Sequence, residues 1–149
     1  FFSRFSFSFL GADMEPEDAV DMLRKGDARV GLCYQNLGAA GAEALAEELK
    51  TNRTCTALHL NGNGIGSDGA WALAEALKQN STLTHLHLQM NDLNDPGGES
   101  LLDAIKLNNR IQKLTLKFND IDVEIMDQIH EQLTRNVEVT QLRSYASVR

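Results

Sequence analysis

Histidines are the residues of this chain best suited to chemistry, because an imidazole can change its charge near neutral pH and can bind a metal ion. His59, His85 and His87 lie in a segment that repeats every 28 residues, and this spacing separates His59 from His87. The three imidazoles could form a metal site or a pH-sensitive surface, since adjacent imidazoles resist double protonation. No fourth ligand is evident, so we predict solvated histidines and neither a metal nor a cofactor.

The repeat determines where these histidines lie. Its clearest copy is Leu83-x-x-Leu86-x-Leu88-x-x-Asn91-x-Leu93. Further copies follow the same 28-residue period, with full copies at Cys55 and Ile111, a degraded copy at Asp27 and a first half at Val139. Asn91 follows the leucines at a point where an inward amide can bond the backbone groups of a turn. A constant period of this length predicts a solenoid.

Each unit has two halves with different periodicities. Alternating leucines, such as Leu86 and Leu88, predict a short strand with one buried face. Apolar residues then recur at helical spacing, as they do through residues 70–77. Ser67 and Asp95 occupy equivalent positions before two of these helices, and we expect their side chains to cap the helix N-termini.

These repeats resemble the leucine-rich repeats of the ribonuclease-inhibitor type over residues 27–143. The segments that carry the resemblance are LHLNGNGIGSDGAWALAEALKQNSTL and LHLQMNDLNDPGGESLLDAIKLNNRI. The resemblance implies an α/β solenoid in the form of a short horseshoe arc, with parallel strands on its concave face and helices on its convex face. It leaves the function open, because proteins with similar repeats have many different functions.

The sequence predicts one repeat domain with short segments on either side. Residues 1–13 form a leader, which is disordered or non-native, a targeting-peptide remnant or an edge strand. The remaining predicted parts are an N-terminal capping helix at 14–26, units at 27–54, 55–82, 83–110 and 111–138, a partial strand at 139–143 and a tail at 144–149. No cap is evident at the C-terminal end, so either the chain is a fragment or a partner covers that end.

Composition excludes several classes of partner. The net charge of −7, from 21 acidic and 14 basic residues, argues against nucleic-acid binding. No apolar run is long enough to span a membrane. Cys33 and Cys55 do not form a disulfide framework, and Cys55 replaces a core leucine of the repeat. We therefore expect a cytoplasmic protein without a nucleic-acid or membrane partner.

Residues between the buried leucines should point outward on the concave face and align from strand to strand. Several of them are basic, whereas the predicted helices are rich in carboxylates, so an acidic protein partner would suit this face. The residues predicted to bind it are His59, His85, His87, Gln89, Lys113, Thr115, Lys117 and Arg143. Trp71 is a further candidate, because equivalent helix positions hold outward carboxylates and an exposed tryptophan can anchor an interface.

No set of residues indicates catalysis, since neither cysteine has an evident base beside it and no paired carboxylates share a predicted pocket. The sequence thus favours a protein–protein interaction module that binds its partner on the concave face. The resemblance leaves two alternatives open. One is a regulator of a small GTPase, similar to Ran GTPase-activating protein. The other is a structural segment of a larger cytoskeletal, axonemal or immune-receptor scaffold.

Overall fold

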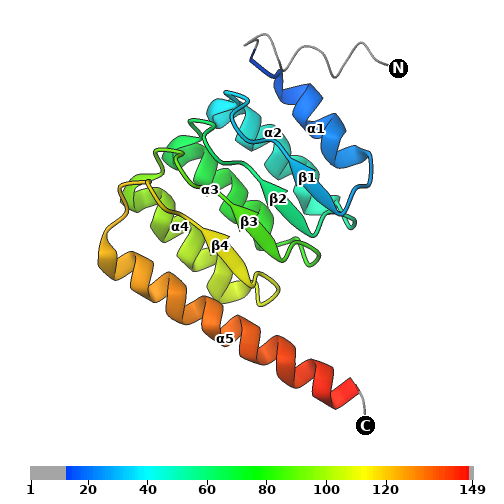
Figure 1. Ribbon diagram of the computed structural model, residues 1–149, viewed down its shortest axis with the longest axis vertical. Coiled ribbons are helices and arrows are strands. Elements are labelled where there is room, and N and C mark those ends of the chain that lie inside the picture. The colour runs from blue at the N-terminus through cyan, green and yellow to red at the C-terminus, as the bar shows by residue number, and fades with distance from the viewer. Residues whose placement is uncertain (1–12, 148–149) are drawn as a thin grey trace.

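Strands and helices alternate along the chain, as the repeat predicts (Figure 1). The computed structural model describes residues 13–147. Its elements are α1 (Pro16–Arg24), β1 (Arg29–Gly31), α2 (Gly38–Thr51), β2 (Ala57–His59), α3 (Gly66–Leu77), β3 (His85–His87), α4 (Asn94–Leu107), β4 (Lys113–Thr115) and α5 (Val123–Ser147). Residues 1–12, and with them nearly all of the predicted leader at 1–13, lie outside the described residues.

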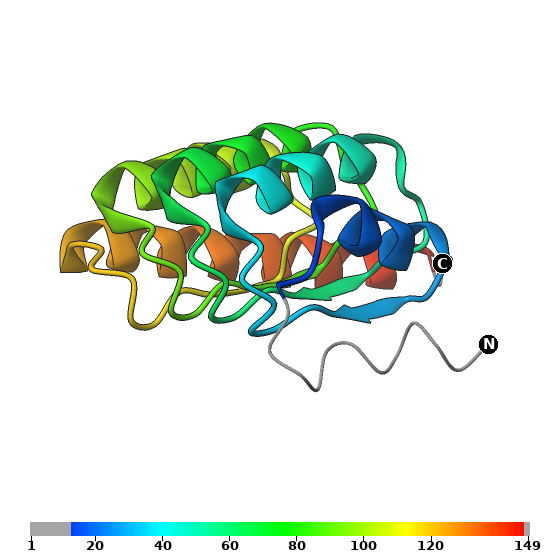
Figure 2. The ribbon, with the colours of Figure 1, turned by 90° about the horizontal axis from the view of Figure 1, so that it is seen from above.

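The four strands form one parallel sheet in the order β1-β2-β3-β4. Residues 28 apart in the sequence face each other across each pair of strands, as Leu58 and Leu86 do. Helices α2, α3 and α4 cover one face of the sheet and leave the other face open (Figure 2). The predicted leucine-rich-repeat solenoid, with strands on the concave face and helices on the convex face, is confirmed.

The core lies between the sheet and the helices, and the leucines of the repeat fill it. Leu58 and Leu60 are completely buried, and burying one such side chain contributes about 1.5–3 kcal/mol. The helices also pack closely at buried glycines in their first turns. A Cβ atom at Gly69 would lie 2.5 Å from Cγ2 of Ile65 and 2.9 Å from Cβ of Ala42, so only glycine fits there.

Buried asparagines join the units where the strands end. We name Asn63, Asn91 and Asn119 the exit asparagines, and each is at most 3% exposed. The Oδ1 atom of Asn91 accepts hydrogen bonds from the backbone N–H groups of Asn63 and Ile65, and its Nδ2 group donates to the Leu60 carbonyl. Asn63 and Asn119 make equivalent bonds. These amides therefore satisfy backbone groups that the turns bury.

A second set of asparagines lies at the opposite ends of the strands, where the chain returns from a helix. We name them the return asparagines: Asn52, Asn80, Asn108 and Asn136, all buried. The Nδ2 group of Asn80 donates to the Leu49 and Asn52 carbonyls of the preceding unit, and its Oδ1 atom accepts from the N–H groups of Thr82 and Leu83. Within residues 13–147, no buried side-chain nitrogen or oxygen lacks a hydrogen bond.

Helix α1 covers the N-terminal end of the core. Leu23 is completely buried against α2, and Arg24 pairs with Glu48 of α2 at 3.0 Å. The backbone N–H of Met14 donates to the Gln35 carbonyl, which fixes the entry of the chain beside the first unit. An end unit of a solenoid needs such a cover, because it would otherwise expose one face of the core.

Helix α5 covers the C-terminal end, so the prediction of an end without a cap is wrong (Figure 1). Its side chains Ile125, Ile129 and Leu133 pack against the core. The predicted partial strand at 139–143 is also wrong, because α5 continues through these residues and into the predicted tail. A strand here would place the polar Ser144 at the core position that Leu116 holds in the preceding unit, and burying it unpaired is unfavourable.

The predicted helix caps are wrong as well. Helices α3 and α4 begin after Ile65 and Leu93, neither of which makes a capping side-chain hydrogen bond. Ser67 Oγ donates to the Leu93 carbonyl at 2.7 Å, and Asp95 Oδ1 accepts from the N–H of Asp122 at 2.7 Å. Both side chains therefore join one unit to the next, because the helices begin earlier than the sequence pattern indicates.

Replacing an exit asparagine should destabilise the whole solenoid. Asn91→Ala removes the acceptor of two buried N–H groups, and we expect the free energy of unfolding to fall by about 2–4 kcal/mol. Urea denaturation followed by circular dichroism measures this change. The exposed Asn109→Ala serves as the control and should change stability by less than about 0.5 kcal/mol. Equal effects of the two substitutions would contradict this role of the exit asparagines.

Candidate functional site

Side chains from all four strands align on the open face of the sheet. We name this surface the sheet face and define it by three rows: Arg29, Ala57, His85 and Lys113; Gly31, His59, His87 and Thr115; and Cys33, Asn61, Gln89 and Lys117. It carries all predicted binding residues except Arg143 and Trp71. The strand positions follow from the parallel register, because residues 28 apart face each other.

Two histidines stack at the centre of the sheet face. The ring centroids of His59 and His87 are 4.4 Å apart, and the ring planes differ by 4°. Thr115 Oγ1 lies 3.1 Å from Nδ1 of His87, and Thr84 Oγ1 lies 2.8 Å from Nδ1 of His85. The predicted adjacency of His59 and His87 is confirmed, and neighbouring hydroxyl groups orient two of the three imidazoles.

The surroundings of His87 favour its neutral form. Partial burial lowers the pKa of His87, and the charges of His59, Lys113 and His85 lower this pKa further. Protonating both stacked rings would place two positive charges in contact, which is unfavourable. The lowered pKa of His87 therefore keeps this imidazole neutral at neutral pH.

Two kinds of site are missing from the part of the chain that the structure describes. Residues 13–147 contain no group of three or more His, Cys, Asp or Glu side chains arranged to hold a metal ion. None of the helices in this range is long and apolar enough to cross a membrane. Cys55 is completely buried, as its place in the repeat predicts, and burial raises the pKa of its thiol, so it is a poor nucleophile.

The basic side chains of the sheet face form no ion pair with an acidic side chain of the described residues. Arg29, Lys113 and Lys117 are exposed, and no ion pair within residues 13–147 involves them. On the helical side, by contrast, Lys78 pairs with Glu75 at 2.5 Å. The charges of the sheet face are therefore available to a partner.

Arg143 does not lie on the sheet face. It belongs to α5, and its guanidinium donates to Oδ1 of Asn109 at 3.2 Å. The prediction that Arg143 points outward on the concave face is wrong because the fifth strand does not form. The basic character of the sheet face is thus limited to the first and last strands, with Lys117 just beyond β4.

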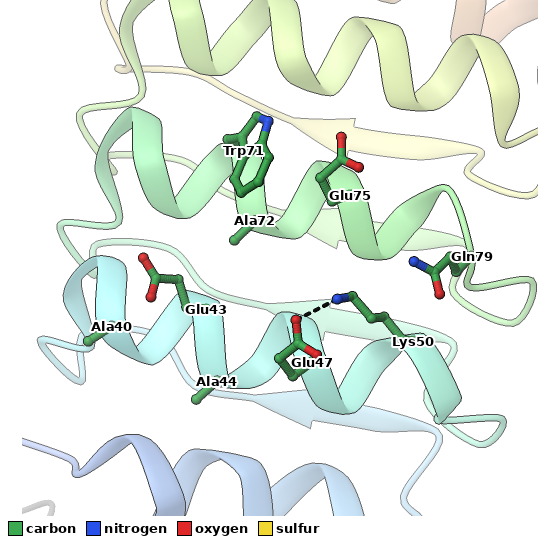
Figure 3. Close-up of a pocket in the computed structure, with 9 residues that line it drawn as sticks. All are labelled: Ala40, Glu43, Ala44, Glu47, Lys50, Trp71, Ala72, Glu75 and Gln79. Atoms are coloured by element: carbon green, nitrogen blue, oxygen red, sulfur yellow. Dashed lines mark hydrogen bonds and ion pairs between the residues drawn. The ribbon is translucent and has the colours of Figure 1, made fainter.

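Trp71 lies on the opposite side of the molecule, on the outer surface of α3 (Figure 3). It is 59% exposed, as the outward position in the repeat predicts. Beside it, a groove of about 590 Å³ separates α2 from α3, with the small residues Ala40, Ala44 and Ala72 and the longer residues Glu43, Glu47, Lys50, Glu75 and Gln79 among its lining. Trp71 and the sheet face are therefore two separate surfaces.

Three exposed apolar residues lie at one position of the repeat and were not predicted from the sequence. Tyr34, Met90 and Phe118 are spaced like the histidines, and Gly62 holds the remaining equivalent position. Comparing this position across the copies of the repeat would have found them. They come directly after the third row of the sheet face, at the start of the loops that lead to the helices.

Known proteins resemble the chain mainly in fold. The Leucine Rich repeat family model matches residues 51–74 and 79–102, whereas no curated protein matches the sequence significantly. A solved structure of leiomodin-1 actin-binding site 2 has a TM-score of 0.73 at 20% identity, covering 89% of this chain and 95% of that one. The tropomodulin C-terminal domain of Caenorhabditis elegans has a TM-score of 0.53 at 16% identity, covering 88% and 98%.

The lowered pKa of His87 makes stability depend on pH. The unfolded chain binds the His87 proton more tightly, so folding becomes less favourable as the pH falls through the ordinary histidine value of about 6.5. The decrease ends below the pKa in the folded protein. We expect His87→Gln to reduce the fall in melting temperature between pH 8 and pH 5, and the exposed His130→Gln to leave it unchanged. An unchanged pH profile for His87→Gln would contradict this role.

Proposed function

We propose that this solenoid, whose residues 51–74 and 79–102 match the Leucine Rich repeat family model, is a protein-binding module whose partner lies on the sheet face. Lys113 and Lys117 attract the partner, and the histidines and Gln89 offer hydrogen bonds. The observation that carries the proposal is the exposed basic side chains of this surface, which have no acidic partners within residues 13–147. The proposal includes no catalytic step.

Rigidity supports the use of this surface. Strands β2, β3 and β4 have buried asparagines at both ends, so their side chains keep their positions when a partner binds. A preformed surface loses little conformational entropy on binding, which favours affinity. The partner best suited to it is acidic, because exposed basic groups accelerate association with a negatively charged protein.

Actin is the partner to test first. The leiomodin-1 structure with a similar fold is described as an actin-binding site, and the two chains align over most of their lengths. Identity of 20% shows a shared fold and not a shared partner, so actin binding is part of the proposal. A cytoskeletal partner would also be consistent with the cytoplasmic location that the sequence predicts.

Reversing the charge of the sheet face should weaken partner binding. We expect Lys113→Glu/Lys117→Glu to reduce the affinity for purified actin at least about tenfold, mainly through slower association. Biolayer interferometry with monomeric actin and co-sedimentation with filaments measure this effect. The control, Lys78→Glu/Lys106→Glu, changes the net charge equally on the helical side. Equal losses in both variants would reject the sheet face, and no binding by the unmodified protein would reject actin.

Trp71 tests whether the convex face takes part in the same contact. Because Trp71 and the sheet face lie on opposite sides, we expect Trp71→Ala to leave actin affinity within about twofold. Its stability should change by less than about 1 kcal/mol, because most of the side chain is exposed. A loss of affinity as large as that of the lysine variant would place the partner on the groove between α2 and α3.

A further inference from the structure

Three exposed apolar side chains form a line along the loops beside the sheet face. Tyr34, Met90 and Phe118 are 68%, 50% and 78% exposed. We name these three residues, together with Gly62, the exit-loop ladder. Large apolar side chains that recur at one repeat position and remain outside the core indicate a contact surface, because such groupings are uncommon on monomeric proteins.

The backbone of the exit-loop ladder is strained by its large side chains. The φ angles of Tyr34, Met90 and Phe118 are 57°, 58° and 61°, in the left-handed region that bulky residues rarely adopt. Gly62, with φ of 69°, occupies the same position without that strain. Three units therefore hold bulky side chains where glycine would fit better, although the side chains add little to the core. Strain of this kind is typical of functional positions.

Hydrogen bonds continue from the sheet into these loops and align the ladder. The N–H groups of Tyr34, Gly62 and Met90 donate to the carbonyls of Asn61, Gln89 and Lys117, the residues that precede the ladder in the next unit. Successive members are therefore about 4.8 Å apart, as strands are. A ladder of four members then extends over roughly 14 Å.

The ring of Tyr34 fills the space beside Gly62, where the ladder lacks a side chain. A Cβ atom on Gly62 would lie 2.3 Å from ring carbons of Tyr34, so the ring covers this glycine. The Tyr34 hydroxyl reaches to within 4.0 Å of the Met90 sulfur. Tyr34 and Met90 thus form one continuous apolar surface, and Phe118 follows in the next repeat unit.

Charges of opposite sign precede and follow the ladder along the chain. Lys117 comes directly before Phe118, and Lys113 lies further back on β4. Asp92 and Asp120 come two residues after Met90 and Phe118, and both are exposed. A basic residue of the sheet face therefore precedes Phe118, and exposed carboxylates follow Met90 and Phe118 in the exit loops.

We propose that the exit-loop ladder binds an amphipathic helix of the partner protein, lying across the loops. A helix can present an apolar stripe with acidic residues on one flank and basic residues on the other, whereas the side chains of an extended peptide alternate between opposite faces. About ten helical residues span the ladder. This proposal rests on the proposed function, since the ladder borders the sheet face and Lys117 of that face comes directly before Phe118.

A synthetic helical peptide tests the proposal without any known partner. The probe has 14 residues, with leucines at helical spacing, glutamates on one flank and lysines on the other. A permuted peptide of the same composition but without the stripe is the matched control. We expect saturable binding of the first peptide by fluorescence anisotropy, with amide chemical-shift changes at residues 34, 62, 90 and 118. No saturable binding, or equal binding of the permuted peptide, would overturn the proposal.

Glycine substitutions separate binding from folding. We expect Met90→Gly/Phe118→Gly to weaken peptide binding at least about tenfold, while the melting temperature stays equal or rises because glycine relieves the strain. The exposed Leu107→Ala, at the far end of α4, should leave the affinity unchanged. Equal affinity of the glycine variant and the unmodified protein would overturn the proposal.

Other occupants of the ladder would give different results. Dimers in sedimentation that Phe118→Gly dissociates would show that a second copy covers it. Stronger peptide binding after changing Phe5, Phe7 and Phe9 to serine would assign it to residues 1–12. Either result overturns the proposal.

The two proposals can also fail separately. If the peptide binds but actin does not, only the choice of actin is rejected. If actin binding depends on Lys113 and Lys117 but the peptide does not bind, only the ladder fails.

Discussion

The structure depends on backbone hydrogen bonds that buried asparagine side chains complete. Strands of three residues pair over too short a length to hold the chain by themselves, and the turns at both ends bury polar groups. Exit and return asparagines satisfy these groups across the boundary between units, so each unit needs its neighbour. This mutual dependence fixes the register at 28 residues and aligns every outward side chain of the sheet face.

The same regularity divides the molecule into surfaces of different chemistry. The sheet face has basic groups and stacked histidines, whereas the outer helices carry carboxylates, several of them paired with lysines of the same helix. Between these surfaces, the exit loops hold apolar side chains in a strained conformation. A repeat can vary such positions more freely than the buried ones, because these side chains lie outside the core.

The C-terminal end shows how the repeat stops. Asn136 keeps the position of a return asparagine and donates to the Ile105 and Asn108 carbonyls, although it lies within α5. Its Oδ1 atom accepts a hydrogen bond from the side chain of Gln132 in the same helix. In Asn80, by contrast, Oδ1 accepts from the backbone N–H groups of Thr82 and Leu83, in the turn that follows the helix. The helix therefore runs on past Asn136, and its apolar side chains near Ile129 take the place that another unit would occupy.

The sequence by itself determined the solenoid, the strand positions and the adjacency of His59 and His87, because a fixed period places equivalent residues side by side whatever their type. Only the tertiary structure decided that residues 139–143 are helical, which removed Arg143 from the sheet face. It also revealed the left-handed backbone beneath Tyr34, Met90 and Phe118. The reason is physical: the end of a repeat and the shape of its loops depend on which neighbour is available to accept each hydrogen bond, and this neighbour is distant in the sequence.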